Sequence, residues 1–302
     1  MFLAIYRKTL CDLSEPKSLV TYLVTFTVVL FFLSIGFTND MPAEVATLPL
    51  TEQGVELLAV YASLSYFWGV GLGLLTAGSL FVALTLATEA ERGTLDLVLS
   101  KPVQRWRVLL AVLLANVTFL FAVGVAGLLL SAVVIYEMAG FSAAALGGGV
   151  FDVLPAMLLY TLAICVLVAA VGTASSVVTR NRLQTAALTA IIPVLFFAMF
   201  VARAFPGSIY EDYSLYLIDV SYHLGNVYVL LLNTISGPLP ADVQVRVGFW
   251  TGVYELPAEQ ESLPESLELI GYVDPGVSLV LYLSVVVGLL ALAGVRFQRL
   301  DI

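Results

Sequence analysis

Charge is concentrated in one short segment of this chain, residues 88–110, which reads TEAERGTLDLVLSKPVQRWRVLL and lies between two long uncharged stretches. Its charged residues are Glu89, Glu91, Arg92, Asp96, Lys101, Arg105 and Arg107. Carboxylates and guanidinium groups at this density can pair with one another or with the rim of a partner's surface, where charges fix the register of binding. The chemistry that this segment suggests is therefore recognition.

Other residues with reactive side chains are few. A phosphate-binding loop needs glycines before a lysine, and none of the three lysines, Lys8, Lys17 and Lys101, follows a glycine. Cys11 and Cys165 are too far apart in predicted depth to pair or to share a metal ion, and we expect the single His223 to be a hydrogen-bonded surface residue. We therefore assign no catalytic, cofactor-binding or metal-binding residue.

The elements that must position the charged segment are membrane spans. Of the 302 residues, 60% are hydrophobic and 12% are charged, and the mean hydropathy is +1.00. Soluble domains are about a quarter charged. A bilayer core about 30 Å thick needs roughly 20 helical residues. Six runs qualify, at residues 19–37, 57–87, 108–136, 153–178, 185–205 and 277–295. The first is too long for a signal-peptide core and has no A-x-A cleavage site after it, so we expect it to remain in the membrane.

The orientation follows from the basic residues, which are retained on the cytoplasmic side. With the N-terminus inside, only Arg203 and Arg246 of the 13 basic residues fall outside. The inner ones are Arg7, Lys8, Lys17, Arg92, Lys101, Arg105, Arg107, Arg180, Arg182, Arg296 and Arg299. Most acidic residues then lie outside, including Asp40, Glu44, Glu52, Glu56, Glu255, Glu259, Glu261, Glu265 and Glu268. Both termini are predicted to be cytoplasmic, and the net charge of −9 belongs mainly to outer loops and indicates no nucleic-acid partner.

The charged segment is then the longest inner loop, at residues 88–107. The retention rule alone accounts for its basic residues but not for Glu89, Glu91 and Asp96. Leu95, Val98 and Leu99 have helical spacing, and Arg92 lies one turn from Asp96, so a short amphipathic helix is predicted after Gly93 and before Pro102, with its apolar side available to a partner.

This string resembles the signature of ABC type-2 transporter permeases, E-x-G-T-L followed by L-x-x-P-V-x-R and L-L. The C-terminal residues 297–302, FQRLDI, are similar to that family's F-x-R-x-D-I tail. The resemblance implies that the inner loop docks on a separate ATPase subunit. The residues it assigns to this contact are Glu89, Glu91, Arg92, Gly93, Thr94, Leu95, Leu99, Pro102, Val103 and Arg105.

The resemblance further implies an all-α, six-span permease of an ATP-driven exporter in the plasma membrane. ATP and magnesium would be bound by the ATPase, and a second permease subunit would complete a homodimer or heterodimer. Similar proteins include permeases of the copper-processing type that serves nitrous-oxide reductase maturation, but few methionines and two isolated cysteines give no support for a copper cargo. The transported substrate is left open. The alternative is a membrane anchor or assembly factor that docks a soluble partner and transports nothing.

Four further features concern the spans and the segment before them. Residues 2–13 place Leu3, Tyr6, Leu10 and Leu13 on one face of a helix, which predicts an interfacial helix within a cytoplasmic segment at residues 1–18. In span two, the small residues Gly69, Gly73 and Ala77 recur every four positions, which favours close helix packing within one subunit over a dimer seam. Pro193 is expected to kink span five. No predicted span has an ionisable residue near its centre, which argues against a secondary transporter.

The outer segment between spans five and six, residues 206–276, is the remaining region. Residues 227–232 are apolar but too short to cross, so a re-entrant or interfacial helix is predicted. Residues 243–249 alternate with period two, which predicts an exposed strand. Together they would form a small extracellular cap over the exit. The chain thus divides into residues 1–18, spans one to five at 19–205, the cap, and the last span with a cytoplasmic tail at 277–302.

Overall fold

The structure, a computed structural model, describes residues 2–38, 45, 47–100, 104–203, 207–257 and 263–299. Within these ranges the chain is helical, and its extended pairing is limited to one isolated antiparallel bridge between Tyr254 and Leu269. This confirms an all-α membrane protein. Several residues used above lie outside the described ranges: Asp40, Glu44, Lys101, Pro102, Val103, Glu259, Glu261 and residues 300–302.

Six helices in the described residues are long and apolar enough to cross a membrane, as predicted. The first, third, fourth, fifth and sixth are α2 (Pro16–Thr38), α8 (Arg105–Ala139), α9 (Leu154–Thr179), α10 (Arg182–Ala202) and α14 (Pro275–Gln298). Span two consists of α4 (Leu50–Leu64), η1 (Ser65–Gly73) and α5 (Leu74–Ala83). Pro193 lies inside α10, which is continuous from end to end, and the kink there remains a prediction.

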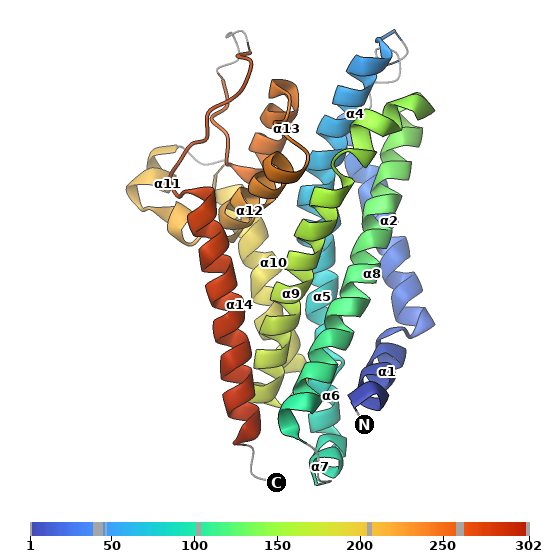
Figure 1. Cartoon of the computed structure of the whole chain (residues 1–302), viewed down its shortest axis with the longest axis vertical. Helices are drawn as coiled ribbons and strands as arrows, with labels where there is room; N and C mark the ends of the chain where they lie inside the picture. Colours follow the sequence, from blue (N-terminus) through green and yellow to red (C-terminus); the bar gives the residue numbers. More distant parts are fainter. Residues whose placement is uncertain are drawn as a thin grey trace.

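Span two lies at the centre of the bundle. In its most apolar stretch 78% of the residues are buried, against 17% in α2 and 17% in α14. Figure 1 shows α2 and α14 on opposite sides of the bundle. Because all six helices have similar hydropathy, the sequence alone could not separate the central span from those whose apolar surface faces outward.

Span two is not a regular α-helix, because η1 is a nine-residue π-helical segment in which Gly71 has φ −68° and ψ −107°. A Cβ on Gly71 would lie 2.5 Å from the Tyr66 carbonyl oxygen, and one on Gly73 would lie 2.6 Å from the Trp68 carbonyl oxygen. Gly69 has more space, with no neighbour closer than 3.7 Å. The expected small-residue face therefore includes one position, Gly73, where the backbone itself requires the absence of a side chain.

The N-terminal helix α1 (Phe2–Leu13) forms as predicted, but one of its four expected contact residues points away from the protein. Leu13 is buried and Tyr6 donates a hydrogen bond to the Thr118 hydroxyl of α8 over 3.1 Å, whereas Leu3 is 71% exposed. Thr9 is buried instead, so the face of α1 that packs against the protein contains Thr9 and Leu13. Pro16 begins α2 as its first residue, because a proline at that position leaves no backbone hydrogen bond unmade.

The predicted cap is helical throughout its regular part. It consists of α11 (Gly207–Asp212), η4 (Leu215–Leu217), α12 (Val220–Ile235) and α13 (Ala241–Thr251), at the end of the molecule opposite α1 in Figure 1. The helix predicted at residues 227–232 is part of α12. Between α8 and α9 lie the short segments η2 (Ala143–Ala145) and η3 (Gly147–Phe151) at the same end.

The strand predicted at residues 243–249 is wrong, because these residues belong to α13. Val243 and Val247, four positions apart, are completely buried, while Phe249 is 58% exposed. The burial of these side chains therefore follows a helical period. The sequence suggested a strand because valines stand at alternate positions and β-branched residues are common in sheets. Gly252, with φ +68°, ends the helix in the left-handed conformation.

Candidate docking site at the inner loop

The charged segment forms a helical hairpin rather than the single predicted helix. Its two arms are α6 (Leu86–Glu91) and α7 (Thr94–Leu99), and Gly93 between them has φ +72°. The Thr94 hydroxyl donates hydrogen bonds to the carboxylate and the backbone carbonyl of Glu89, which closes the turn. We call α6, the turn and α7 the inner hairpin.

The apolar side of the inner hairpin is turned into the protein. Leu95 is 4% exposed and Leu99 is 8% exposed. They belong to a cluster whose other buried members are Leu86, Val108, Leu109, Val112, Ala174, Val177, Ala293 and Phe297, from α6, α8, α9 and α14. The expectation that this apolar side is available to a partner is therefore wrong. Among the α7 side chains that the structure describes, Leu97 is apolar and exposed, at 68%.

The charges of the inner hairpin pair with other helices rather than with each other. Lys8 of α1 forms an ion pair with Glu89, and Arg180 forms one with Asp96 over 2.8 Å. Arg92 ends α6 instead of pairing with Asp96 along one helix, because the turn at Gly93 separates them. Since Lys8 and Arg180 are 81 and 84 residues from their partners, nothing in the local sequence pattern indicated either pair.

A third connection runs to the junction between α9 and α10. The backbone N–H of Arg182 donates a hydrogen bond to the Glu91 carboxylate over 3.3 Å. Arg180, at the same junction, has φ +51°, a conformation that residues other than glycine rarely adopt. The inner hairpin is thus connected to α1 and to the helix ends of spans four and five.

The first turn of α8 extends this surface. The Arg105 guanidinium donates a hydrogen bond to the Gln298 carbonyl at the end of α14 over 2.9 Å. Trp106 is 50% exposed, and the Arg107 guanidinium lies 5.4 Å from the centre of its ring. Sequence reasoning missed Trp106, although an exposed aromatic residue between two arginines is typical of interfaces.

Polar groups at the opposite end form a separate, buried cluster. The Arg203 guanidinium lies 3.3 Å from the fully buried Asp219 carboxylate, which also accepts a hydrogen bond from the Tyr210 hydroxyl. Burial, and then the neighbouring carboxylate, raise the pKa of Tyr210. Arg246 pairs with Glu56 over 2.7 Å, which joins α13 to α4. These pairs hold the cap on the bundle.

His223 is hydrogen-bonded through both ring nitrogens, and the two cysteines do not form a disulfide. The His223 ring nitrogens lie 3.1 Å from the Ser278 hydroxyl and 3.2 Å from the Leu217 carbonyl oxygen, as expected of a hydrogen-bonded histidine. Cys11 and Cys165 are both free thiols.

The chain matches the family described as ABC-2 family transporter protein over residues 17–302. A search of curated proteins found no match. The family match covers all six spans and the inner hairpin. Together with six spanning helices, it shows that this protein is a multi-pass membrane permease and not itself a catalytic subunit. The chain belongs to the ABC-2 family of transporter proteins.

Proposed function

We propose that this permease is the membrane subunit of an ATP-driven exporter, and that a separate ATPase subunit docks on its inner hairpin at the cytoplasmic face of the plasma membrane. The observation that carries the proposal is that one side of the hairpin is buried in the protein and the other side is exposed. Its buried leucines anchor it to α8, α9 and α14, while Leu97, Glu91 and Arg92 remain exposed for a partner. A second permease subunit, identical or different, would complete the transporter.

The distribution of basic residues supports the cytoplasmic assignment of this end. The contacts of Lys8, Arg180 and Arg105 bring them together at one end of the molecule, where α1, α7 and the end of α14 lie in Figure 1. Arg246, by contrast, pairs with Glu56 at the other end. Because basic residues near spans are retained in the cytoplasm, the hairpin end is assigned to the inside.

The connections of the hairpin also suggest how a partner would drive transport. A force on the inner hairpin would reach α9 through Arg180, α10 through Arg182 and α1 through Lys8. Helix shifts at interfaces are a common form of such coupling. The hairpin therefore works as a rigid unit between the ATPase and the spans.

The proposal is tested with Leu97→Asp, compared with Leu217→Asp in the cap, where Leu217 is 59% exposed. We expect Leu97→Asp to insert and fold normally but to lose co-purification with the ATPase and at least tenfold of the ATPase stimulation, because a carboxylate replaces an exposed apolar contact. Leu217→Asp should behave like the wild type. The measurements are pull-down of the ATPase and ATP hydrolysis by the reconstituted pair.

A second variant, Leu95→Asp, distinguishes an effect on docking from an effect on folding. Because Leu95 is buried in the protein's own cluster, its replacement should lower the yield of folded permease rather than act on docking alone.

Normal ATPase binding and stimulation by Leu97→Asp would contradict the proposed docking surface. Normal binding without ATP-dependent transport by the wild-type pair would favour the anchor or assembly factor.

A further inference from the structure

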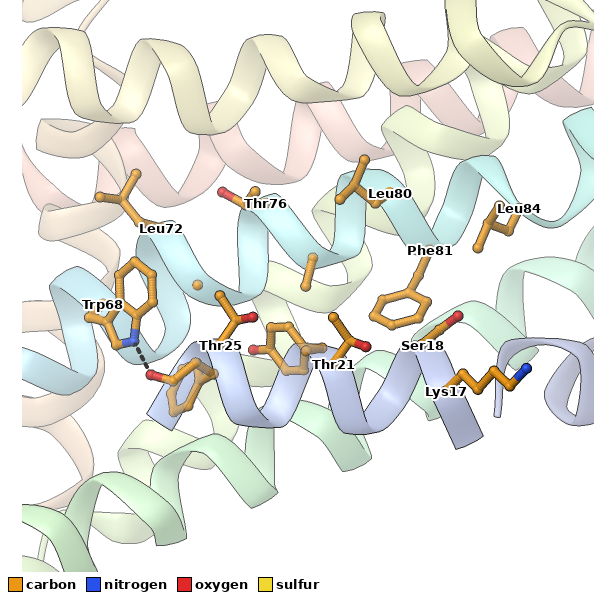
Figure 2. Close-up of a pocket in the computed structure, with 14 residues that line it drawn as sticks. Lys17, Ser18, Thr21, Thr25, Trp68, Leu72, Thr76, Leu80, Phe81 and Leu84 are labelled. Carbon is orange, nitrogen blue, oxygen red and sulfur yellow. Dashed lines mark hydrogen bonds between the residues drawn. The ribbon is translucent and has the colours of Figure 1, made fainter. Parts of the chain in front are cut away.

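A groove of about 550 Å³ runs along the outside of the bundle between α2 and the η1–α5 part of span two, as Figure 2 shows. Its volume lies within the range of small-molecule sites. On the span-two side its wall is largely apolar, with Leu72, Leu80, Phe81 and Leu84. The α2 side carries Lys17 at one end, followed by Ser18, Thr21 and Thr25 along the helix.

The groove has a closed end near the middle of the bilayer. Phe26 and Trp68 stack with their ring centres 5.9 Å apart, and the Trp68 indole N–H donates a hydrogen bond to the Phe26 carbonyl over 3.2 Å. Gly73 permits this closure, since a Cβ there would lie 3.0 Å from the Phe26 ring. The nine helical steps from Lys17 to Phe26 advance about 13 Å, roughly half of a bilayer core about 30 Å thick. The groove therefore spans one leaflet.

The hydroxyl groups in the groove differ from several others in the spans. Thr27, Ser63 and Ser79 each donate a hydrogen bond to the carbonyl four residues earlier, at 2.7–2.8 Å. Ser18, Thr21 and Thr25 make no such bond within the described part of the chain, and neither does Thr76 on the opposite wall. These hydroxyls are free to donate to a ligand that brings its own acceptors.

Charge complementarity selects the ligand. Lys17 is exposed at the mouth of the groove and is the second residue of α2, a position that would place it near the lipid phosphates. Basic residues at that depth attract anionic lipids. Ester oxygens just below a phosphate would accept hydrogen bonds from Ser18 and Thr21. We propose that this groove binds one acyl chain of an anionic phospholipid from the leaflet at the α1 end, with its phosphate on Lys17 and its chain against Leu80 and Leu72.

The test titrates the purified, delipidated full chain with phosphatidylglycerol or with phosphatidylcholine of identical acyl chains, and counts bound lipids by native mass spectrometry. We expect one phosphatidylglycerol per chain to bind in preference to phosphatidylcholine. Lys17→Gln should weaken phosphatidylglycerol binding by about fivefold, the contribution of one basic residue near an anionic surface. Thr76→Phe, which fills the groove, should abolish this preferred binding.

Matched controls are Arg299→Gln, which removes an exposed basic residue at the end of α14, and Ser284→Phe, which adds a ring to a different span. Both should bind lipid like the wild type. Equal phosphatidylglycerol affinity in Lys17→Gln and the wild type would overturn the proposal. So would a dimer that Thr76→Phe converts to monomers, because the groove would then be covered by a second copy of the chain.

This inference goes beyond the export proposal and does not depend on ATP. The binding assay contains no ATPase, so a failure of ATP coupling would leave its expected result unchanged. Lys17 is also exposed, so that its replacement should not affect folding; loss of lipid preference in Lys17→Gln is informative even where Thr76→Phe is poorly folded.

Discussion

At the scale of single residues, Arg180 meets two conflicting demands. Its φ of +51° is a conformation that costs about 1–2 kcal/mol for a residue with a Cβ. Its guanidinium nevertheless pairs with Asp96 on the inner hairpin. Both side chains are more than a third exposed, so the pair adds at most about 1 kcal/mol to stability. The presence of an arginine at this position is better explained by its connection to the inner hairpin than by a gain in stability.

We expect Arg180→Gly to be more stable than Arg180→Ala. Both variants lose the pair with Asp96, but only glycine removes the strain of a positive φ. The difference should be about 1 kcal/mol, visible as a higher apparent melting temperature of the glycine variant in the same detergent. Equal melting temperatures would show that the backbone at this junction is not strained. ATPase stimulation should fall in both variants, since both lose the connection to α7.

Single residues also show what could be read from the sequence of the site. The sequence predicts a helix that begins after Gly93, and the φ of +72° at Gly93 confirms a turn before it. The spacing of Leu95 and Leu99 correctly placed them on one face. Spacing does not say what covers a face, so their burial against α8, α9 and α14 could not be predicted. Whether these two leucines contact the ATPase stays a prediction. The docking contact that we propose is instead made by the exposed Leu97.

At the scale of elements, span two is the least regular helix and the most buried one. Its π-helical segment η1 places Tyr66 and Phe67 against the cap: the Tyr66 hydroxyl donates to the Ser221 carbonyl over 2.5 Å, and Phe67 lies 4.1 Å from Trp250 between ring centres. Such segments are frequent at functional sites. The same segment forms one end of the lipid groove through Trp68 and Leu72.

Gly71→Ala is expected to lower the apparent melting temperature clearly, by an equivalent of about 1–3 kcal/mol, because the added Cβ would clash with the Tyr66 carbonyl and the Phe196 ring. Gly36→Ala in α2 is the matched control, since a Cβ there meets nothing within 4 Å. It should melt at or slightly above the wild-type temperature, as glycine weakens a helix. The π-helical geometry would be refuted by two variants that melt alike.

Elements were predictable to the extent that hydropathy defines them. The six spans follow from runs of apolar residues, because a bilayer demands about 20 of them in a row. The helix α13 was missed because its valines at alternate positions suggested a strand. Pro240 before its first turn and Gly252 after its last are the terminal signals that indicated a helix. The π-helical segment had no sequence signal beyond its three glycines, which equally suit close packing.

At the scale of the whole molecule, the two ends differ in chemistry. The end with α1, the inner hairpin and the last turn of α14 collects basic residues, while the other end carries the helical cap. Composition predicted this polarity, because the retention rule depends only on the counts of basic residues in short loops. It could not predict that each end is held together by ion pairs between distant segments, such as Arg246 with Glu56.

The orientation is testable with single cysteines in a background of Cys11→Ser and Cys165→Ala. Leu97→Cys and Leu217→Cys replace exposed residues at opposite ends. In intact cells, a membrane-impermeant maleimide should label Leu217→Cys, and Leu97→Cys should react only after the membrane is permeabilised. The reverse pattern would place the inner hairpin outside, where no cytoplasmic ATPase can reach it.

The last span is fastened at several depths. At the cap end Ser278 accepts a hydrogen bond from the Asn226 amide over 2.9 Å, and further along the Tyr282 hydroxyl donates to the Ala163 carbonyl over 2.7 Å. At the other end the Gln298 carbonyl accepts a hydrogen bond from the Arg105 guanidinium. A free helix accommodates a thinner bilayer by tilting. Because these bonds join α14 to α12, α9 and α8, we expect the four helices to tilt together when the bilayer thins.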